Sequence, residues 1–141
     1  EGMVAEPVVA ISSGDAAPAR ALDLLVVDND PRIVEASLAL LDRLGHRARG
    51  VADSAGALAE CATIDAVLAD YQLDDGEDGL TLIEALRVRR PGLPAVLITA
   101  EGNAAIRRRA AEIGVEMLAK PVAPALLEAF LARVSVAEVK P

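Results

Sequence analysis

Apolar residues recur along this chain in short continuous runs separated by longer stripes with a spacing of three to four. Four runs have the length and aliphatic content of buried strands: LDLLVV (22–27), IDAVLA (64–69), PAVLIT (94–99) and VEMLA (115–119). A fifth run, HRARGV (46–51), is polar, which is typical of a strand at a sheet edge where arginines discourage further pairing. The pattern therefore predicts five strands.

A helical pattern follows each predicted strand. The first stripe comprises Ile33, Val34, Leu38, Leu41 and Leu44 and is closed by Gly45; later helices are expected over 53–61, 80–90 and 103–112, and the last carries Leu126, Leu127, Phe130, Leu131 and Val134. Strict alternation of strands and helices indicates a mainly parallel sheet with helices on both faces. We therefore expect an α/β fold, a doubly wound five-stranded parallel sheet.

The two ends of the chain differ from this pattern. Residues 1–20 are rich in Ala, Pro, Ser and Gly and have no stable period, so we expect a flexible N-terminal arm or linker there. The folded domain is predicted to occupy residues 21–136, followed by a tail over 137–141.

Composition narrows the function. The 141 residues are 53% hydrophobic and carry a net charge of −8, which argues against a nucleic-acid binder. The three arginines at 107–109 are predicted to form a solvated helix face. Cys61 is the single cysteine and is expected to be a small buried residue. No run approaches a membrane span and no signal peptide is evident, so the prediction is a cytoplasmic chain without membrane contact.

Most predicted strands end at polar residues. Four strands have such an end: Asp28-Asn29-Asp30, Asp70, Thr99 and Lys120. Carboxyl ends of parallel strands meet at one edge of the sheet, where ligands bind. Asp30 precedes Pro31 and is assigned to a helix N-cap. The joint placement of the others indicates a functional site.

The chemistry available to this set is limited. Clustered carboxyl and amide oxygens favour a hard divalent cation such as Mg²⁺, beside which a carboxylate can attack phosphorus. A hydroxyl and an ammonium opposite the carboxylate would hold phosphoryl oxygens. The chain has no glycine-rich nucleotide motif, and its one histidine, His46, begins the weak edge strand. The residues therefore predict phosphoryl transfer onto Asp70 from a donor supplied by another protein.

Four segments, LLVVDNDP, VLADYQL, LITAEG and MLAKP, resemble the motifs of the bacterial response-regulator receiver domain over residues 22–135. The resemblance implies the flavodoxin-like (βα)5 fold and a histidine kinase or histidine phosphotransfer protein as partner. It implies the following site: Asp70 as phosphoacceptor, Asp28, Asn29, Asp70 and the backbone carbonyl of Gln72 as Mg²⁺ ligands, and Thr99 and Lys120 as phosphoryl partners. A cis peptide at Lys120-Pro121 is also implied.

Two departures from the family pattern concern function. Asn29 replaces the usual second acid; its amide oxygen can still ligate, but the expected Mg²⁺ affinity is lower. Met117 stands where many relatives carry an aromatic switch residue, so ring rotation does not transfer to this chain, and Thr99 and Met117 are the switch positions to examine. By the same resemblance, Gln72 and Glu101 tune autodephosphorylation.

The stretch ADYQLDDGEDG looks like C-terminal receivers of hybrid sensor histidine kinases, with the N-terminal arm as the linker. The chain would then perform self-catalysed phosphotransfer and autodephosphorylation without being a kinase itself, as a monomer or weak dimer. Its further acids, Asp74, Asp75, Glu77 and Asp78, are expected to form a solvated turn leading into a helix N-terminus.

Two alternatives compete with this interpretation. A haloacid-dehalogenase-type phosphatase would use Asp28 and Asp30 as its D-x-D motif, but the acidic pair expected after the lysine is missing and Asp70 is left unexplained. A pseudo-receiver, a docking module that is never phosphorylated, is favoured by Asn29 and opposed by the retention of Asp70, Thr99 and Lys120.

Overall fold

A computed structural model describes residues 21–100 and 102–139. Within these residues, five strands form one parallel sheet in the order β2-β1-β3-β4-β5. The strands are β1 (Asp23–Val27), β2 (Arg47–Val51), β3 (Ala66–Asp70), β4 (Ala95–Thr99) and β5 (Glu116–Ala119). The predicted doubly wound sheet is confirmed, and so is the edge position of the polar strand 47–51.

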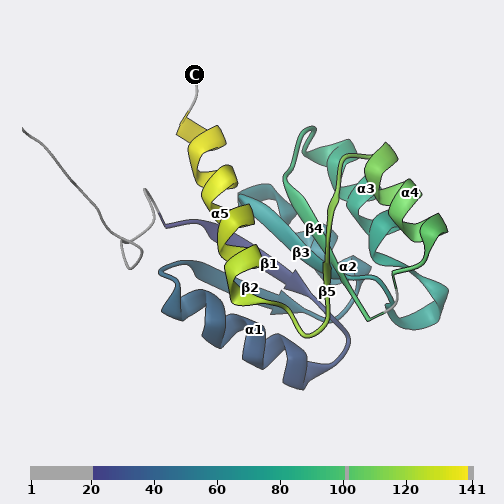
Figure 1. Cartoon of the computed structure of the whole chain (residues 1–141), viewed down its shortest axis with the longest axis horizontal. Coiled ribbons are helices and arrows are strands. Elements are labelled where there is room, and N and C mark those ends of the chain that lie inside the picture. The colour runs from purple at the N-terminus through teal and green to yellow at the C-terminus, as the bar shows by residue number, and fades with distance from the viewer. Residues whose placement is uncertain (1–20, 101, 140–141) are drawn as a thin grey trace, which may run out of the picture.

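Helices cover both faces of the sheet (Figure 1). On one face lie α1 (Pro31–Arg43) and α5 (Pro124–Val139); on the other lie α2 (Ser54–Glu60), α3 (Gly79–Arg89) and α4 (Ala104–Glu112). Two short 3-10 helices lie in the connections: η3 (Cys61–Thr63) between α2 and β3, and η4 (Asp74–Gly76) between β3 and α3. Helix α5 continues to Val139, beyond the predicted tail boundary at 136, and the predicted arm 1–20 lies outside the described residues.

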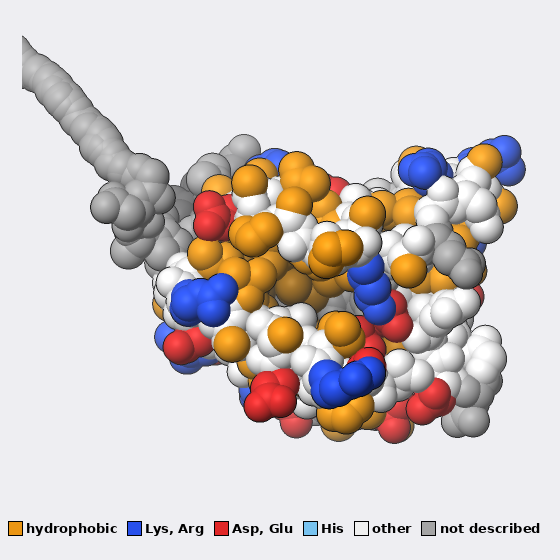
Figure 2. Space-filling model, turned by 60° about the horizontal axis from the view of Figure 1, so that its bottom comes forward, with side chains coloured by type: hydrophobic (Ala, Val, Ile, Leu, Met, Phe, Trp, Pro, Cys, Tyr) orange, Lys and Arg blue, Asp and Glu red, His pale blue; other side chains and the backbone are white. Residues whose placement is uncertain are grey.

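The face carrying α1 and α5 buries one side of the sheet. Its core comprises Leu22, Leu24, Val26, Leu41, Ala66, Leu68, Val96, Ile98, Leu118, Leu127, Phe130, Leu131 and Val134. Helix α1 lies close to the sheet because β2 has Gly50 beneath it: a Cβ there would clash with Val34 Cγ1. Ile33, in the predicted apolar stripe, remains 38% exposed. Figure 2 shows hydrophobic side chains around a hollow on this side of the molecule.

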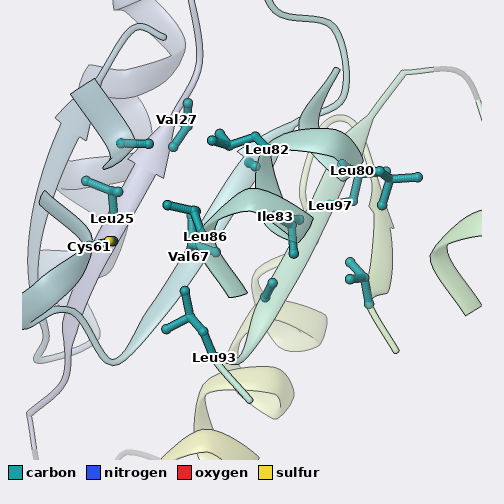
Figure 3. Packing of buried hydrophobic residues seen from close by; sticks show 14 of the residues in the cluster. Leu25, Val27, Cys61, Val67, Leu80, Leu82, Ile83, Leu86, Leu93 and Leu97 are labelled. Carbon is teal, nitrogen blue, oxygen red and sulfur yellow. The ribbon is translucent and has the colours of Figure 1, made fainter. Parts of the chain in front are cut away.

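The opposite face packs α2, α3 and α4 against the alternate strand residues. Figure 3 shows Leu80, Ile83 and Leu86 of α3 in one cluster with Leu97 and Val67 of the sheet. The central strands are apolar on both sides, as expected where helices cover both faces. Cys61 is buried in this cluster, as predicted.

Polar residues fix where the helices begin, and thereby where the strand-to-helix loops run. Asp30, Asp53, Asp78 and Asn103 each accept a hydrogen bond from a backbone N–H of the first helical turn. Asp30 is the predicted cap, with Pro31 at the first helical position. None of the described helices has the length and apolar content that a membrane span requires.

Candidate functional site

The carboxyl ends of three strands bring two acids and one lysine together. Lys120 Nζ lies 2.8 Å from Asp70 Oδ1 and 3.6 Å from Asp28 Oδ2. Asp28 is 4% exposed and Asp70 is 7% exposed, so both carboxylates are largely removed from water. We call these three residues the buried triad. All three were predicted to meet here from the strand ends alone.

Gly79 allows the start of α3 to lie against the end of β3, next to Asp70. The Gly79 N–H donates to the Tyr71 carbonyl at 2.8 Å, which folds the loop after Asp70 back onto the strand. A Cβ at Gly79 would clash with the Asp70 carbonyl oxygen. Any other residue would push α3 away from the end of β3. Sequence reasoning missed this role, and the signal available to it was a glycine directly after a capping acid.

The triad carries more negative than positive charge, and its pKa values reflect this. Burial raises the pKa of the Asp70 carboxyl; the hydrogen bond from Lys120 opposes the rise, and the nearby charge of Asp28 adds to it. For Lys120, burial lowers the pKa, but the hydrogen bond and charge of Asp70 and the charge of Asp28 outweigh burial and raise it. Lys120 therefore stays charged and only partly compensates its neighbours.

Thr99 lies at the end of β4 next to Lys120, and Met117 lies on β5, three residues before Lys120. Thr99 is buried at the end of β4, where its carbonyl accepts from the Lys120 N–H at 3.1 Å. The Lys120-Pro121 peptide is cis, as the family resemblance implied. Met117 is half-buried and packs against the core under α3 and α4, and the predicted tuning residue Glu101 lies outside the described residues.

Three acids lie in the segment between β3 and the first turn of α3: Asp74, Glu77 and Asp78. We call them the loop acids. Each has its own partner: Asn29 Nδ2 donates to Asp74 Oδ1 at 2.7 Å, Ser54 Oγ donates to Glu77, and Arg109 Nη1 lies 3.2 Å from Asp78 Oδ2. The prediction of a solvated turn leading into a helix N-terminus is confirmed, because Asp74 and Glu77 are exposed and Asp78 caps α3; the partners of these acids were not predicted.

The structure corrects the prediction for Arg109. It was predicted to lie on a solvated face with Arg107 and Arg108, which are indeed exposed. Arg109 instead joins α4 to the start of α3, because it bonds Asp78 and also donates to Thr81 Oγ1. Burial raises the pKa of Asp78, but the hydrogen bonds from the Thr81 N–H and from Arg109 outweigh it, and the net pKa is lowered.

The triad and the loop enclose an open hollow of about 660 Å³. Its lining includes Asn29, Gln72, Glu77 and Asp78 as well as the triad. Asp30 also reaches the hollow, but its carboxylate accepts from the Arg32 N–H and pairs with the Arg32 guanidinium, in keeping with its predicted role as a cap.

The residues present fit a hard divalent cation. Two buried carboxylates share a single ammonium, so the hollow has unbalanced negative charge, and Asn29 and Gln72 offer amide and carbonyl oxygens beside it. Among the described residues, no three His, Cys, Asp or Glu side chains gather as a metal site, so a cation here would need those neutral oxygens as well.

An apolar hollow of about 410 Å³ adjoins the polar one. It shares Asp28, Ile33, Asp70 and Lys120 with it and extends between α1 and the loop after β5, lined there by Ala36, Leu40, Pro121 and Val122. The reactive strand ends are thus bordered by a surface able to accept apolar side chains.

His46 is excluded from this chemistry by its position. It lies directly before β2, at the edge of the sheet, and its Nδ1 accepts from the Leu22 N–H at 3.0 Å. Burial lowers the pKa of the imidazole, so it is a neutral structural acceptor near pH 7.

Comparison with known proteins agrees with the architecture. The model of the response regulator receiver domain matches residues 24–132. The chain is 35% identical over 96 residues to the nitrogen assimilation regulatory protein NtrX of Azorhizobium caulinodans, covering 62% of this chain and 21% of that protein. It is 29% identical over 117 residues to the phyllosphere-induced regulator PhyR of Methylorubrum extorquens, covering 80% and 43%. The chain thus spans less than half the length of either relative.

Solved structures show the same fold. A receiver domain protein from Methanospirillum hungatei superimposes with a TM-score of 0.76 at 24% identity, covering 84% of this chain and 98% of that one. The chemotaxis protein CheY4 of Vibrio cholerae gives 0.73 at 24% identity, covering 82% and 99%. Because the family model covers most of the chain, the chain belongs to the response-regulator receiver domains.

Proposed function

We propose that this receiver domain takes a phosphoryl group onto Asp70, in a Mg²⁺-dependent reaction, from a phosphohistidine on a histidine kinase or histidine phosphotransfer protein. The observation that carries the proposal is the buried triad, in which one ammonium, Lys120 Nζ, lies 2.8 Å from Asp70 and 3.6 Å from Asp28. A stable structural pair would need one acid only. A bound Mg²⁺ ion would account for the presence of a second buried acid.

The chemistry follows from the charges. A carboxylate oxygen of Asp70 bonds to phosphorus as the phosphorus–nitrogen bond of the donor breaks, and the imidazole nitrogen leaves with the bonding electron pair. Burial raises the pKa of Asp70 and makes its oxygens more basic, hence better nucleophiles. Asp28, Asp70, Asn29 and the backbone carbonyl of Gln72 would hold Mg²⁺. The bound cation would offset the repulsion between the Asp70 carboxylate and the phosphoryl group.

Two further residues would hold the product. Lys120 already donates to Asp70, so its ammonium can move to a phosphoryl oxygen without leaving the site. Thr99 lies at the neighbouring strand end, with its side chain on a buried position, and its hydroxyl is the candidate for a second phosphoryl oxygen. A shift in the position of Thr99 would be transmitted to β5, which pairs with β4. It would also reach α4, because Met117 of β5 packs against the core cluster that contains residues of α4.

The apolar hollow beside the triad is the proposed contact for the donor. A phosphohistidine on a donor helix must approach Asp70 closely, and the surface next to Asp70 is formed by α1 and the loop after β5. Ile33 is the exposed apolar residue that lines both hollows. We assign it to docking of the protein donor rather than to the chemistry.

The test is intact-mass analysis after incubation with acetyl phosphate and Mg²⁺, with Asp70→Asn as the control. We expect a gain of one phosphoryl group that requires Mg²⁺ and is absent in the control. If the protein gains no phosphoryl group and does not bind beryllofluoride, the chain is a docking module instead. Steady turnover of a phosphomonoester would point to a phosphatase.

A second arm separates docking from chemistry. Ile33→Asp should slow transfer from a phosphorylated histidine phosphotransfer protein at least about tenfold, because a charge replaces an apolar contact at the interface. It should slow phosphorylation by acetyl phosphate much less, because this small donor needs no docking surface and the added charge at the edge of the polar hollow is the only change that it meets. Val88→Asp is the matched control, since Val88 is 82% exposed on α3, in the other helical layer. Equal effects of the two substitutions would contradict docking at α1.

A further inference from the structure

We propose that Asp74 is a positioning residue for the cation site: it holds the Asn29 amide so that the amide oxygen, rather than the nitrogen, is presented to Mg²⁺. The inference rests on the proposed function and adds a residue to it. It concerns position 29, where this chain departs from the family pattern by carrying an amide, Asn29, in place of the usual acid.

The geometry gives the amide a defined orientation. Asn29 Nδ2 donates to Asp74 Oδ1 at 2.7 Å, and Asn29 lines the hollow that contains Asp28 and Asp70. A carboxylate accepts hydrogen bonds and cannot donate one, so Asp74 bonds only the nitrogen end of the amide. The amide oxygen of Asn29 then points away from Asp74. Without this partner the amide could flip and present two N–H donors, which no cation binds.

The same contact explains why an amide suits position 29. Asp74 belongs to η4, 45 residues further along the chain, and this 3-10 turn brings its carboxylate within hydrogen-bond distance of residue 29. An acid at position 29 would put two carboxylates at that separation, which is repulsive. The amide turns the repulsion into a hydrogen bond, and the negative charge beside the cation site is supplied by Asp74 instead.

Such support affects affinity more than stability. Both side chains are exposed, so their hydrogen bond contributes little to folding. A residue that orients a metal ligand, in contrast, typically changes metal affinity by about 10- to 100-fold when it is replaced. Metal affinity is therefore the quantity to measure.

The experiment titrates the protein with MgCl₂ and follows both heat and the fluorescence of Tyr71, the single tyrosine of a chain without tryptophan, adjacent to Asp70. Asp74→Asn should weaken Mg²⁺ binding about tenfold, because the amide introduced at position 74 can pair with either end of the Asn29 amide. The double substitution Asn29→Asp/Asp74→Asn reverses the hydrogen bond between isosteric groups and keeps the net charge. Because an acid at position 29 is also a charged ligand, the double variant should bind Mg²⁺ at least as tightly as the unmodified protein, and more tightly than Asn29→Asp alone, in which two carboxylates face each other.

Glu77→Gln is the matched control. Glu77 lies on the same loop and itself lines the hollow that Asn29 lines, and its replacement removes the same charge without removing the partner of Asn29. We expect a change of less than about threefold, reduced further at high salt because a field effect is screened. Equal weakening by Asp74→Asn and Glu77→Gln would overturn the inference, as would an Asp74→Asn protein with unchanged affinity.

The two proposals fail in different ways. If the unmodified protein binds no Mg²⁺, the proposed function and this inference both fall. If it binds Mg²⁺ and becomes phosphorylated, but the double substitution does not recover the affinity lost in Asp74→Asn, only the positioning role of Asp74 falls.

Discussion

The buried triad and the loop acids are two groups of carboxylates on one face of the molecule, held in opposite ways. In the triad, Asp28 and Asp70 share one lysine and are almost inaccessible to water. Each loop acid has a separate donor, from Asn29, Ser54 or Arg109. Each loop acid therefore has a hydrogen-bond donor of its own, and Asp74 and Glu77 also stay exposed to water, whereas the two acids of the triad are buried and share one ammonium.

This difference indicates where the function resides. A carboxylate with its own donor is satisfied in the absence of any ligand, and it serves to fix a loop. A pair of buried carboxylates with one cation between them has a lower free energy when a second cation arrives. Counting acids along the sequence would not separate the two groups, because Asp70 and Asp78 differ in burial and partners and not in residue type.

The largest expected effect comes from breaking the triad. Lys120→Met leaves two buried carboxylates without compensation, and we expect the free energy of unfolding to fall by about 2 kcal/mol in the absence of divalent cations. Urea unfolding in EDTA measures this loss. Adding Mg²⁺ should restore more stability to the variant than to the unmodified protein.

Arg133→Met is the control for the loss of a cationic side chain. Arg133 pairs with Glu116 at an exposed position, so its removal should cost less than about 1 kcal/mol. If Lys120→Met and Arg133→Met cost the same, the triad has no special electrostatic role in the metal-free protein.

The pH dependence should have opposite signs in the two groups. The pKa of Asp70 is raised in the folded protein, because burial penalises its charge. Its contribution to stability is therefore complete below the ordinary value of 3.8 and is lost as pH rises through the folded pKa. Asp70→Asn, measured in EDTA, should become more stable relative to the unmodified protein as pH rises, by on the order of 1 kcal/mol near neutrality.

Asp78 should behave in the reverse direction. Its pKa is lowered, because hydrogen bonds from Thr81 and Arg109 outweigh its burial. Its contribution is present above 3.8 and is lost as pH falls through the folded pKa. Asp78→Asn should cost about 1 kcal/mol near neutrality and nothing in strong acid. Urea unfolding over a pH series tests both, and parallel curves for the two variants would contradict the comparison.

The triad could be predicted from the sequence for a simple physical reason. Apolar runs mark where the strands end, and parallel pairing gathers those ends at one edge, so Asp28, Asp70 and Lys120 need no further information to meet. The fold was predictable on the same basis. Even the polar edge strand at 47–51 was identified by its arginines, one of which pairs with Asp23.

The partners of the loop acids could not be predicted in this way. Asn29 and Asp74 are 45 residues apart and Arg109 and Asp78 are 31 apart, and both pairs lie outside the apolar pattern. An exposed donor has many acceptors within reach that differ by fractions of a kcal/mol, so residue type alone does not choose among them. The close approach at Gly79 had one signal in the sequence, a glycine directly after a capping acid, but the need for glycine depends on the backbone of β3 beneath it.

The smallest expected effect on stability comes from replacing Arg109. This substitution tests whether the contact with a loop acid, Asp78, also restrains the neighbouring helix α4. Arg109→Gln removes the ion pair to Asp78 and the bond to Thr81, at a cost of about 0.5–1 kcal/mol because the guanidinium is partly exposed. Arg108→Gln, on the same helix and exposed, should change stability by less than about 0.5 kcal/mol.

Hydrogen exchange gives the sharper measurement of the same change. If Arg109 fastens α4 to the start of α3, amides of α4 should exchange faster in Arg109→Gln and not in Arg108→Gln, while those of β3 stay protected in both. Equal exchange in the two variants would mean that α4 is held by Ile106 and Ala110 in the core alone. Faster exchange in Arg109→Gln alone would mean that Asp78, which caps α3 and lines the polar hollow, restrains the motion of α4 through Arg109.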